Sequence, residues 1–415
     1  MRTTIWTGAA LAALLLAVPA LAADAMPPGK DQAIGQVFHI TPDSLPAPGA
    51  TPSADKTPST VPRGEHVPLV PTGFTVQLVV EGLDGPRRLL VREDGPIFFT
   101  QQRLGRILKL QDKNNDGTAD MGGLVMEGAL NPFGIATIPV GETKGDLLLV
   151  DQDAAYRLPL QTRGFDFFQM TPDGAFGDPK GHLAHSLAID PQSGEFYVGS
   201  GSMANIDDGE PPMKATILKF SPDGKTQSIF AVGLRNVTGM AFQPGTNALY
   251  AVNMERDGMG DELVPDFLTR VDQGDNFGWP YQYVGGNVQP EYQNKGLKLA
   301  AANVPDVLFE AHSAPLDLAF VPDTWPAQYR GDAVVALHGS WNAGTPRGYK
   351  VVLVHFKDGK PDGSYENLVT GFWVSGTSPA EVWGRPAAVA FDNDGSLLIA
   401  DDLGNTMWRV TPPKS

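Results

Sequence analysis

The chain of 415 residues contains no cysteine. This absence excludes a disulfide framework, a thiol nucleophile, a cysteine-ligated iron–sulfur cluster and a haem attached through cysteine. The protein therefore has to obtain its stability from packing or from bound metal.

Positive charge is also in short supply, because 31 Lys and Arg residues face 47 Asp and Glu residues, for a formal net charge of −16. This balance argues against nucleic acid and anionic membrane surfaces as partners. An anionic ligand would need a local basic cluster, for which Arg235 and Arg385 are candidates.

Long apolar runs are missing after the N-terminus. The first run, from Ile5 to Val18, follows Arg2 and precedes Ala20-Leu21-Ala22. This pattern is typical of a secretory signal, here residues 1–22. The alternative, a membrane anchor, is disfavoured because spanning a bilayer takes ~20 apolar residues. We expect an exported protein, periplasmic or secreted, without stable membrane insertion.

Helical patterns are scarce, whereas 47 Gly and 36 Pro favour many short strands joined by turns. A sequence pattern recurs at intervals of roughly 45 to 80 residues: a polar residue, a run of small apolar residues, a turn and a strand. The recurrence predicts an all-β fold, a six-bladed β-propeller over residues 66–412. The six strand-like stretches are residues 97–100, 147–150, 196–198, 249–252, 334–337 and 397–400.

The segments around this repeat region have different characters. Residues 23–65 are rich in Pro, Ala, Ser and Thr and form either a mobile leader or an extended strap. The last strand, Met407–Val410, could pair with Phe74–Leu78 and so close the ring. If the repeats are equivalent, their leading polar residues lie together at one end of the channel and form a site. These residues are Arg87, Asn131, His182, Arg235, His312 and Arg385.

His182 and His185 are three residues apart at the start of a strand-like stretch. On a strand this spacing places them on opposite faces, so that only one can point into the channel. A structural role is the ordinary outcome for a histidine, but the repeat position favours function for His182. A neutral imidazole is a suitable general base at neutral pH.

Three further motifs follow. The first, Gly233 to Met240, contains Arg235 and Asn236. Arg235 offers a planar guanidinium to a carboxylate or quinone oxygen, and the Asn236 amide adds a donor and an acceptor. The alternative is that Arg235 only binds carbonyl groups at the ends of strands. Residues 253–263 are rich in glycine and carboxylates, which suits calcium or simply a solvated acidic loop. Asn276-Phe277-Gly278-Trp279-Pro280 comes next.

In that order, these motifs resemble the soluble sugar dehydrogenases that use pyrroloquinoline quinone (PQQ), which are six-bladed propellers. The likeness spans residues 65–412. Ser340-Trp341-Asn342 and Gly348-Tyr349-Lys350 lean toward the sorbosone dehydrogenase-like branch rather than the glucose enzyme.

The resemblance implies that His182 removes the substrate hydroxyl proton and that Arg235 polarises the quinone oxygen. It implies that Asn236 and Arg385 hold cofactor oxygens, and that carbonyls near Arg256 and Asp257 bind calcium. Glu262 is a candidate for a second, structural calcium.

The chain departs from the family at several positions. Gly181 stands where the glucose enzymes have an Asp before the catalytic His, and Trp383 falls on one of their paired Arg positions. An early cofactor-contacting Gln of the family has no clear match near Asn131. Arg347 or Lys350 could replace the family's Lys ligand. Trp341 and Trp383 are candidates for stacking on a flat cofactor or a sugar.

A separate signal lies in residues 112–120. Oxygen-bearing side chains at the first, third, fifth and ninth positions, with Gly117 sixth, match the first part of a calcium loop. The twelfth-position Glu is missing, and a plain polar hairpin is the alternative. The candidate ligands are Asp112, Asn114, Asp116 and Asp120.

The sequence therefore predicts an exported, PQQ- and calcium-dependent dehydrogenase that oxidises an aldose or a sugar aldehyde such as sorbosone. Its electrons would pass to a quinone or a separate cytochrome. One alternative is a six-bladed, metal-dependent hydrolase of the lactonase kind, a class that generally has carboxylates and Asn side chains facing the propeller axis. The other is a non-catalytic binding propeller.

Overall fold

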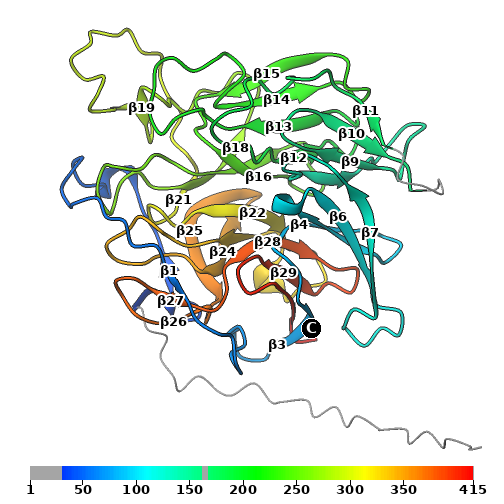
Figure 1. The fold of residues 1–415 in the computed structure, drawn as a ribbon. Coiled ribbons are helices and arrows are strands. Elements are labelled where there is room, and N and C mark those ends of the chain that lie inside the picture. Colours follow the sequence, from blue (N-terminus) through cyan, green and yellow to red (C-terminus); the bar gives the residue numbers. More distant parts are fainter. Residues whose placement is uncertain (1–29, 161–166, 415) are drawn as a thin grey trace, which may run out of the picture.

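The computed structural model describes residues 30–160 and 167–414 and is built of β-strands (Figure 1). Four short 3-10 turns interrupt the strands, and no α-helix occurs within these residues. The predicted all-β class is confirmed. The predicted signal over residues 1–22 lies outside the described residues. No helix in the described part of the chain is long and apolar enough to cross a membrane.

Six sheets of four or five strands follow one another along the chain. The first three are β4 (Pro86–Val91), β5 (Ile97–Gln101), β6 (Arg106–Gln111) and β7 (Met121–Glu127); β8 (Ile135–Thr137), β9 (Leu147–Val150), β10 (Ala155–Leu158) and β11 (Phe168–Gln169); and β12 (Leu187–Ile189), β13 (Phe196–Ser200), β14 (Thr216–Phe220) and β15 (Gln227–Val232).

The other three complete the series. They are β16 (Val237–Phe242), β17 (Leu249–Asn253), β18 (Phe267–Val271) and β21 (Val307–Leu308); β22 (Pro315–Phe320), β23 (Ala333–Leu337), β24 (Lys350–Lys357), β25 (Lys360–Val369) and β1 (Val37–Phe38); and β28 (Pro386–Phe391), β29 (Leu397–Asp401), β30 (Thr406–Thr411) and β3 (Thr75–Glu81). Smaller sheets join β19 (Gln282–Tyr283) to β20 (Asn287–Val288), and β2 (Ser59–Thr60) to β27 (Glu381–Val382) and β26 (Trp373–Ser375).

The first strands of the six sheets form a ring. Strands β4, β8, β12, β16, β22 and β28 contact one another in cyclic order, and β28 contacts β4. Several of them are labelled near the centre of Figure 1. The ring is closed within the sixth sheet, where β3 from the N-terminal part of the chain pairs antiparallel with the C-terminal strand β30. In this pairing Gln77 lies opposite Arg409. The predicted pairing of the two terminal strands is confirmed.

A register shift recurs near the start of four inner strands. It lies between Pro86 and Arg88, Val237 and Gly239, Pro315 and Asp317, and Pro386 and Ala388. A bulge bends a strand and re-aims its side chains, and such bulges are frequent next to active sites. The recurring sequence pattern therefore corresponds to a β-bulge near the start of each of these four strands.

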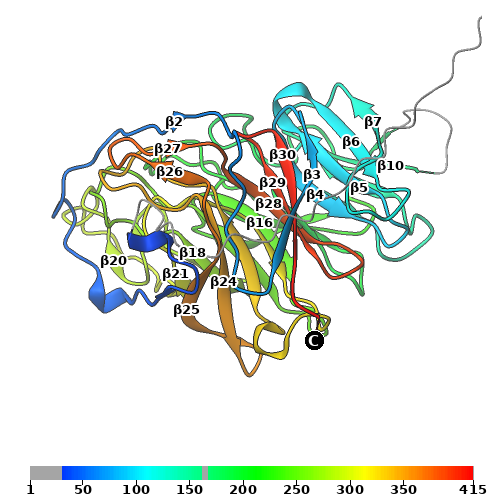
Figure 2. The same ribbon diagram turned by 90° about the horizontal axis from the view of Figure 1, so that it is seen from below.

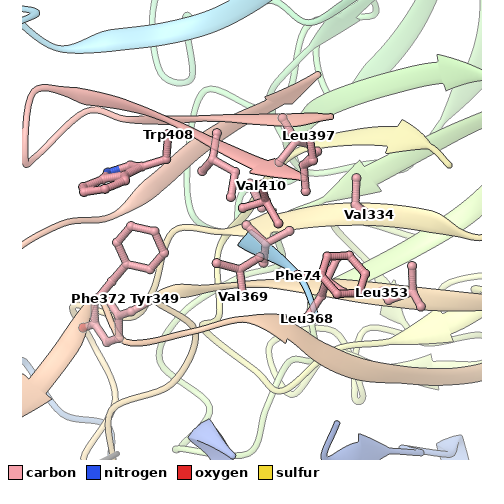
Figure 3. Packing of buried hydrophobic residues seen from close by; sticks show 14 of the residues in the cluster. Phe74, Val334, Tyr349, Leu353, Leu368, Val369, Phe372, Leu397, Trp408 and Val410 are labelled. Carbon is pink, nitrogen blue, oxygen red and sulfur yellow. The ribbon is translucent and has the colours of Figure 1, made fainter. Parts of the chain in front are cut away.

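The hydrophobic core lies between neighbouring sheets. The largest cluster contains Trp325, Trp383 and Trp408, each at most 1% exposed. Figure 3 shows part of it, where Trp408 of β30 lies near Phe372 and Tyr349, and Val410 of the same strand lies near Val369. Each sheet is covered by apolar side chains on both faces, which gives the ring a rigid frame for its loops.

Residues 30–65 lie along the outside of the fifth and sixth sheets (blue in Figure 2). Strand β1 pairs antiparallel with β25, with Val37 opposite Glu366, and β2 pairs parallel with β27, with Ser59 opposite Glu381. We call this segment the strap. It reaches the loops that build the candidate site.

Candidate active site

An open cavity lies at the channel end of the third, fourth and fifth sheets and encloses about 530 Å³, including solvent at its mouth. Six residues that the sequence indicated line it: His182, Arg235, Asn236, Asp257, His312 and Trp341. The remaining lining residues are Met254, Glu255, Asp266, Ala314 and Asn342.

His182 is held in one tautomer. Its Nδ1 lies 2.9 Å from the Ser202 carbonyl oxygen and 3.1 Å from the Ser202 hydroxyl. Because a carbonyl only accepts, Nδ1 carries the proton and the lone pair of Nε2 is free in the neutral ring. Burial, reinforced by the charge of Arg235, lowers the pKa of His182 to about 4. The ring is therefore neutral and able to accept a proton at physiological pH.

Two glycines make room for this ring. Gly181 has a φ of +73°, and a Cβ there would collide with the backbone of Met203 and Ser202. A Cβ at Gly201 would lie 2.5 Å from that of His182. The family's Asp before the catalytic His would therefore not fit here, and the Ser202 carbonyl orients the imidazole instead.

His185 faces away from the cavity. Its side chain is 1% exposed, its Nδ1 bonds the Gly199 carbonyl at 2.9 Å, and its ring lies 5.0 Å from that of Phe176. The expectation that only one of the two histidines points into the channel is confirmed.

The side chain of Arg235 is 6% exposed and is held by three hydrogen bonds that its own N–H groups donate. Nε donates to the Asn205 carbonyl at 3.2 Å, one terminal nitrogen donates to the Glu255 carbonyl at 2.8 Å, and the other donates to Asn205 Oδ1 at 3.0 Å. Asp257 Oδ2 lies 3.9 Å from the guanidinium. The cation is thus pre-positioned at the cavity wall without being fully neutralised.

The motifs that carry the family resemblance pack against each other. Gly233 has a φ of +74°, and a Cβ there would lie 2.5 Å from the Gly278 nitrogen. The indole nitrogen of Trp279 donates to the Asn205 carbonyl at 3.2 Å, and Asn205 in turn bonds Arg235. The Asn-Phe-Gly-Trp-Pro motif therefore supports Arg235 through Asn205, a residue that no sequence signal singled out.

The cavity floor is acidic. Burial raises the pKa of Glu255 to about 7, against the opposing charge of Arg235, and burial raises the pKa of Asp266 to about 6. Asp266 is fixed by the backbone N–H groups of Glu255 and Ala314, both at 2.8 Å. Asp257 differs, because hydrogen bonds and the charge of Arg235 outweigh burial and lower its pKa. Sequence reasoning missed Glu255 and Asp266.

His312, which the sequence indicated through repeat position alone, lies in the cavity wall. Its Nε2 lies 2.9 Å from the Gly260 carbonyl, and its Nδ1 lies 3.1 Å from Asn342 Nδ2 and 3.7 Å from Asp257. Burial disfavours the charged ring, but the contact with Asp257, the Gly260 carbonyl and the charge of Asp266 together outweigh it and raise the pKa of His312. Asn342 adjoins Trp341, which is 48% exposed and lines the cavity, as a ligand-stacking residue would.

The other predicted cofactor-binding residues do not line this cavity. Arg385 donates to the His338 carbonyl at 2.9 Å, and Asn131 donates to Gln152 Oε1 at 2.7 Å. Lys350 is 0% exposed and its Nζ lies 3.0 Å from the Asp31 carbonyl, so it anchors the strap. Trp383 packs its ring on Phe372 in the core, which corrects the expectation that it stacks on a ligand.

The predicted calcium ligands are dispersed. The side chain of Arg256 pairs with Glu291 at 2.8 Å, and Glu262 accepts from the Thr51 hydroxyl at 2.7 Å. In the described residues, no group of three or more His, Asp or Glu side chains is arranged to hold a metal ion.

The candidate calcium loop of residues 112–120 is closed by its own hydrogen bonds. Asp112 accepts from the Gly117 nitrogen at 2.7 Å, and Asp120 accepts from the Lys113 nitrogen at 2.7 Å. Asn114 Oδ1 accepts from the Asp116 nitrogen at 3.0 Å. Calcium binding by this loop stays a prediction.

The strap holds the outer wall of the cavity. The Thr51 hydroxyl accepts from the Asp261 nitrogen at 2.8 Å while donating to Glu262, and the Lys56 nitrogen donates to the Trp341 carbonyl at 2.7 Å. The neighbouring Gly260 carbonyl orients His312. The strap thus supports both the acidic loop and the Trp341 loop.

Replacing Thr51 should loosen this wall. Thr51→Val removes both hydrogen bonds at nearly constant volume, so we expect a loss of about 1–3 kcal/mol in the free energy of unfolding. Amide exchange at Asp261 should accelerate, measured by hydrogen–deuterium exchange. Thr57→Val is the control, because the Thr57 hydroxyl bonds Asp55 within the same segment. Equal exchange in the two variants would contradict a supporting role for Thr51.

A family model described as TrAA12-like matches residues 269–412. The holo PQQ domain of pyranose dehydrogenase from Coprinopsis cinerea is similar at a TM-score of 0.68 and 19% identity, over 86% of this chain and 99% of that one. The resemblance found in the sequence is confirmed. The chain shares the fold of the PQQ-dependent sugar dehydrogenases.

Two more structures agree. The calcium structure of a family AA12 protein from Trichoderma reesei has a TM-score of 0.67 and 19% identity, over 85% of this chain and 99% of that one. The PQQ-bound aldose sugar dehydrogenase of Streptomyces coelicolor has a TM-score of 0.56 and 18% identity, over 83% and 99%. An uncharacterized protein of Borreliella burgdorferi is 31% identical over 234 residues, which span 55% of this chain and 60% of that protein.

The residues of the cavity can be tested against PQQ and calcium. The buried guanidinium of Arg235 is a donor of the kind that a quinone oxygen accepts from. The lone pair of His182 Nε2 and the unpartnered Asn236 Oδ1 are acceptors, which fit a hydroxyl or N–H donor of a substrate or cofactor. Calcium at the Asp257 carbonyl does not fit, because that oxygen already accepts from Asn205 Nδ2 at 3.0 Å and from Arg256 Nε at 3.1 Å. Calcium therefore enters no step of the mechanism below.

Proposed function

We propose that the protein is an exported quinoprotein dehydrogenase that oxidises an aldose or a sugar aldehyde, with PQQ as cofactor. The observation that supports it most is the placement of a neutral imidazole, with Nε2 free, in one cavity with the Arg235 guanidinium. A base and a fixed cation are the two groups that removal of hydride from a hydroxyl-bearing carbon requires. We take the six sheets as the six blades of a propeller.

The residues divide the work as follows. When bound, PQQ supplies the carbon that accepts hydride. His182 takes the substrate hydroxyl proton at Nε2, and the Ser202 carbonyl stabilises the resulting imidazolium through Nδ1–H. Arg235 would present its guanidinium to a quinone oxygen, and Trp341 offers an aromatic face at the cavity mouth. The electron acceptor that we expect is a quinone or a separate cytochrome.

A reconstitution experiment tests the proposal. The apo-protein is titrated with PQQ, with and without calcium, while dye reduction is followed with a panel of aldoses and with sorbosone. We expect a change in quinone absorbance and sugar-dependent dye reduction. If neither appears under any condition, the dehydrogenase proposal is wrong.

The low pKa of His182 predicts an unusual acid limit. A group whose pKa is lowered to about 4 stays deprotonated, and so remains a base, until the pH falls close to that value. The acid limb of kcat/KM should therefore lie near pH 4 to 5 rather than near the ordinary value of about 6.5. The measurement is a pH profile of dye reduction at limiting sugar. An acid limb of kcat/KM near pH 6.5 would show that burial and the charge of Arg235 do not lower the pKa of His182.

A metal-dependent hydrolase of the lactonase kind is the second candidate. The cavity contains Glu255, Asp257, Asp266 and two Asn side chains, the residue types that this class generally presents to its axis. Lactone hydrolysis, followed by acid release in the same preparations with calcium added and PQQ omitted, separates the two. Hydrolysis without dye reduction would favour the hydrolase.

A further inference from the structure

One loop holds both of the groups to which the proposed function gives chemical roles. This loop, residues 201–215, joins β13 to β14. The Ser202 carbonyl accepts from the backbone nitrogen and from Nδ1 of His182, both at 2.9 Å. Three residues later, Asn205 accepts from Arg235 at its carbonyl, at 3.2 Å, and at its Oδ1, at 3.0 Å. Segment 202–205 therefore sets the position of the imidazole relative to the guanidinium.

The middle of this segment is bound by the carboxylate of Glu210. Its Oε1 accepts from the Met203 nitrogen at 2.7 Å and from the Ala204 nitrogen at 3.2 Å, and its Oε2 accepts from the Met203 nitrogen at 3.0 Å. Met203 and Ala204 lie outside the strands, so their N–H groups depend on this side chain rather than on a sheet ladder. Hydrogen bonds to an ionised carboxylate are roughly twice as strong as neutral ones. Glu210 is thus the group that holds the two residues between Ser202 and Asn205.

The backbone at Met203 is packed directly against the segment that carries His182. A Cβ placed on Gly181 would lie 2.4 Å from the Met203 Cα, and one placed on Gly201 would lie 2.5 Å from the His182 Cβ. The loop and the histidine segment therefore touch with no side chain between them to absorb a displacement. Because close packing transmits strain, the hydrogen bonds of Glu210 influence the imidazole as well as the loop.

We propose that Glu210 is a positioning residue for the His182 base and the Arg235 cation. By fixing segment 202–205, it keeps the Ser202 carbonyl on Nδ1 of the imidazole and so leaves Nε2 free to accept a proton. Glu210 does not line the cavity, so it acts through the loop rather than by contact with a ligand. Its role rests on the proposed function, because it serves the same base and the same cation.

The tautomer of His182 in the protein without PQQ is the first readout, measured by NMR of the ring nitrogens in isotope-labelled protein at neutral pH. Both His182 and His185 are neutral there, because burial lowers the pKa of each to about 4. In the wild type both rings should carry the proton on Nδ1, since each Nδ1 faces a carbonyl. In Glu210→Ala, His182 should show both tautomers, whereas His185, held by the Gly199 carbonyl of β13, should not change.

Three further variants separate the reach of the side chain from its charge. Glu210→Gln keeps an oxygen at the same distance and should retain the Nδ1–H tautomer of His182. Glu210→Asp keeps the charge but withdraws the carboxylate by about 1.5 Å, one carbon–carbon bond, and should lose the single tautomer. Asp207→Ala is the matched control, because this carboxylate belongs to the same loop but accepts from the Gly209 nitrogen, at 2.9 Å, outside segment 202–205. It should retain the tautomer.

Turnover supplies the second readout. In the PQQ-loaded enzyme, Glu210→Ala should lower kcat roughly 10–100-fold while KM for the sugar stays within about twofold, because misplaced catalytic groups cost rate more than ground-state binding. Asp207→Ala should leave kcat and KM unchanged.

A single Nδ1–H tautomer of His182 in folded Glu210→Ala or, where that variant folds poorly, in Glu210→Asp would overturn the proposal. So would equal loss of the tautomer in Asp207→Ala. Loss in Glu210→Gln without loss in Glu210→Asp would overturn it too, because charge rather than reach would then be responsible. The tautomer measurement needs no cofactor, so it decides the positioning role even if dye reduction fails and the dehydrogenase proposal falls.

Discussion

His182→Ala should lower kcat by about 10²–10⁴-fold while quinone binding stays close to that of the wild type. The variant removes the cavity base, whose Nε2 is free because Nδ1 is committed to the Ser202 carbonyl. Quinone binding should persist because Arg235 is held by Asn205 and Glu255, without help from His182. The measurements are single-turnover dye reduction and an absorbance titration with PQQ.

His185→Ala is the matched control for this prediction. His185 is the histidine three residues away, in the same segment before β12, and is buried against Phe176 outside the cavity. Its loss should reduce the free energy of unfolding, seen in urea denaturation, and leave kcat within a few-fold in the folded protein. Retained turnover in His182→Ala would remove His182 from the mechanism.

Arg235→Ala should lower both turnover and quinone affinity, with kcat reduced about 10²–10³-fold, as for loss of one oxyanion-stabilising donor. The residue also holds structure, because its donors satisfy the Glu255 carbonyl and two oxygens of Asn205. Its removal leaves these acceptors and Asp257 without their cation, so we expect a loss of about 3–5 kcal/mol in the free energy of unfolding.

Arg409→Ala separates the two effects of the Arg235 substitution. Arg409 is 7% exposed and pairs with Asp392 at 2.6 Å in the sixth sheet, outside the cavity. It should cost comparable stability without changing quinone affinity, as measured by urea denaturation and PQQ titration. If Arg235→Ala behaves in the same way as this control, the guanidinium has no role toward the ligand.

Much of the fold could be predicted from short stretches of the sequence. Apolar stretches of strand length followed turn pairs such as Asp94-Gly95 and Asp394-Gly395, whose glycines adopt φ values of +107° and +85°. These signals depend on a few neighbouring residues, so they survive without knowledge of the tertiary structure. The repeat phase also placed His182, Arg235 and His312 in one cavity, because each opens the pattern of its repeat. The same argument did not hold for Arg87, Asn131 and Arg385, which do not line that cavity.

Contacts between loops were not readable in this way. Glu255 and Asp266 lie in the connection between β17 and β18, which has no periodicity, and Asn205 carries no motif. Yet the two carboxyl groups set the charge of the cavity floor, and Asn205 sets the position of Arg235. Trp341 and Trp383 look alike in sequence, since each follows a site-like segment. One is 48% exposed at the cavity and the other is 1% exposed in the core.

The sequence by itself determined the all-β class, the choice of His182 over His185 as the channel-facing histidine and the likeness to PQQ-dependent sugar dehydrogenases, because periodicity, turns and motifs are local properties. It allowed the closing strand pair without fixing it. The tertiary structure decided which side chains share a cavity, that Ser202 orients His182, and that the strap supports the Trp341 wall. Those facts depend on the convergence of loops from distant parts of the chain, and burial there sets both the unpartnered acceptors and the shifted pKa values.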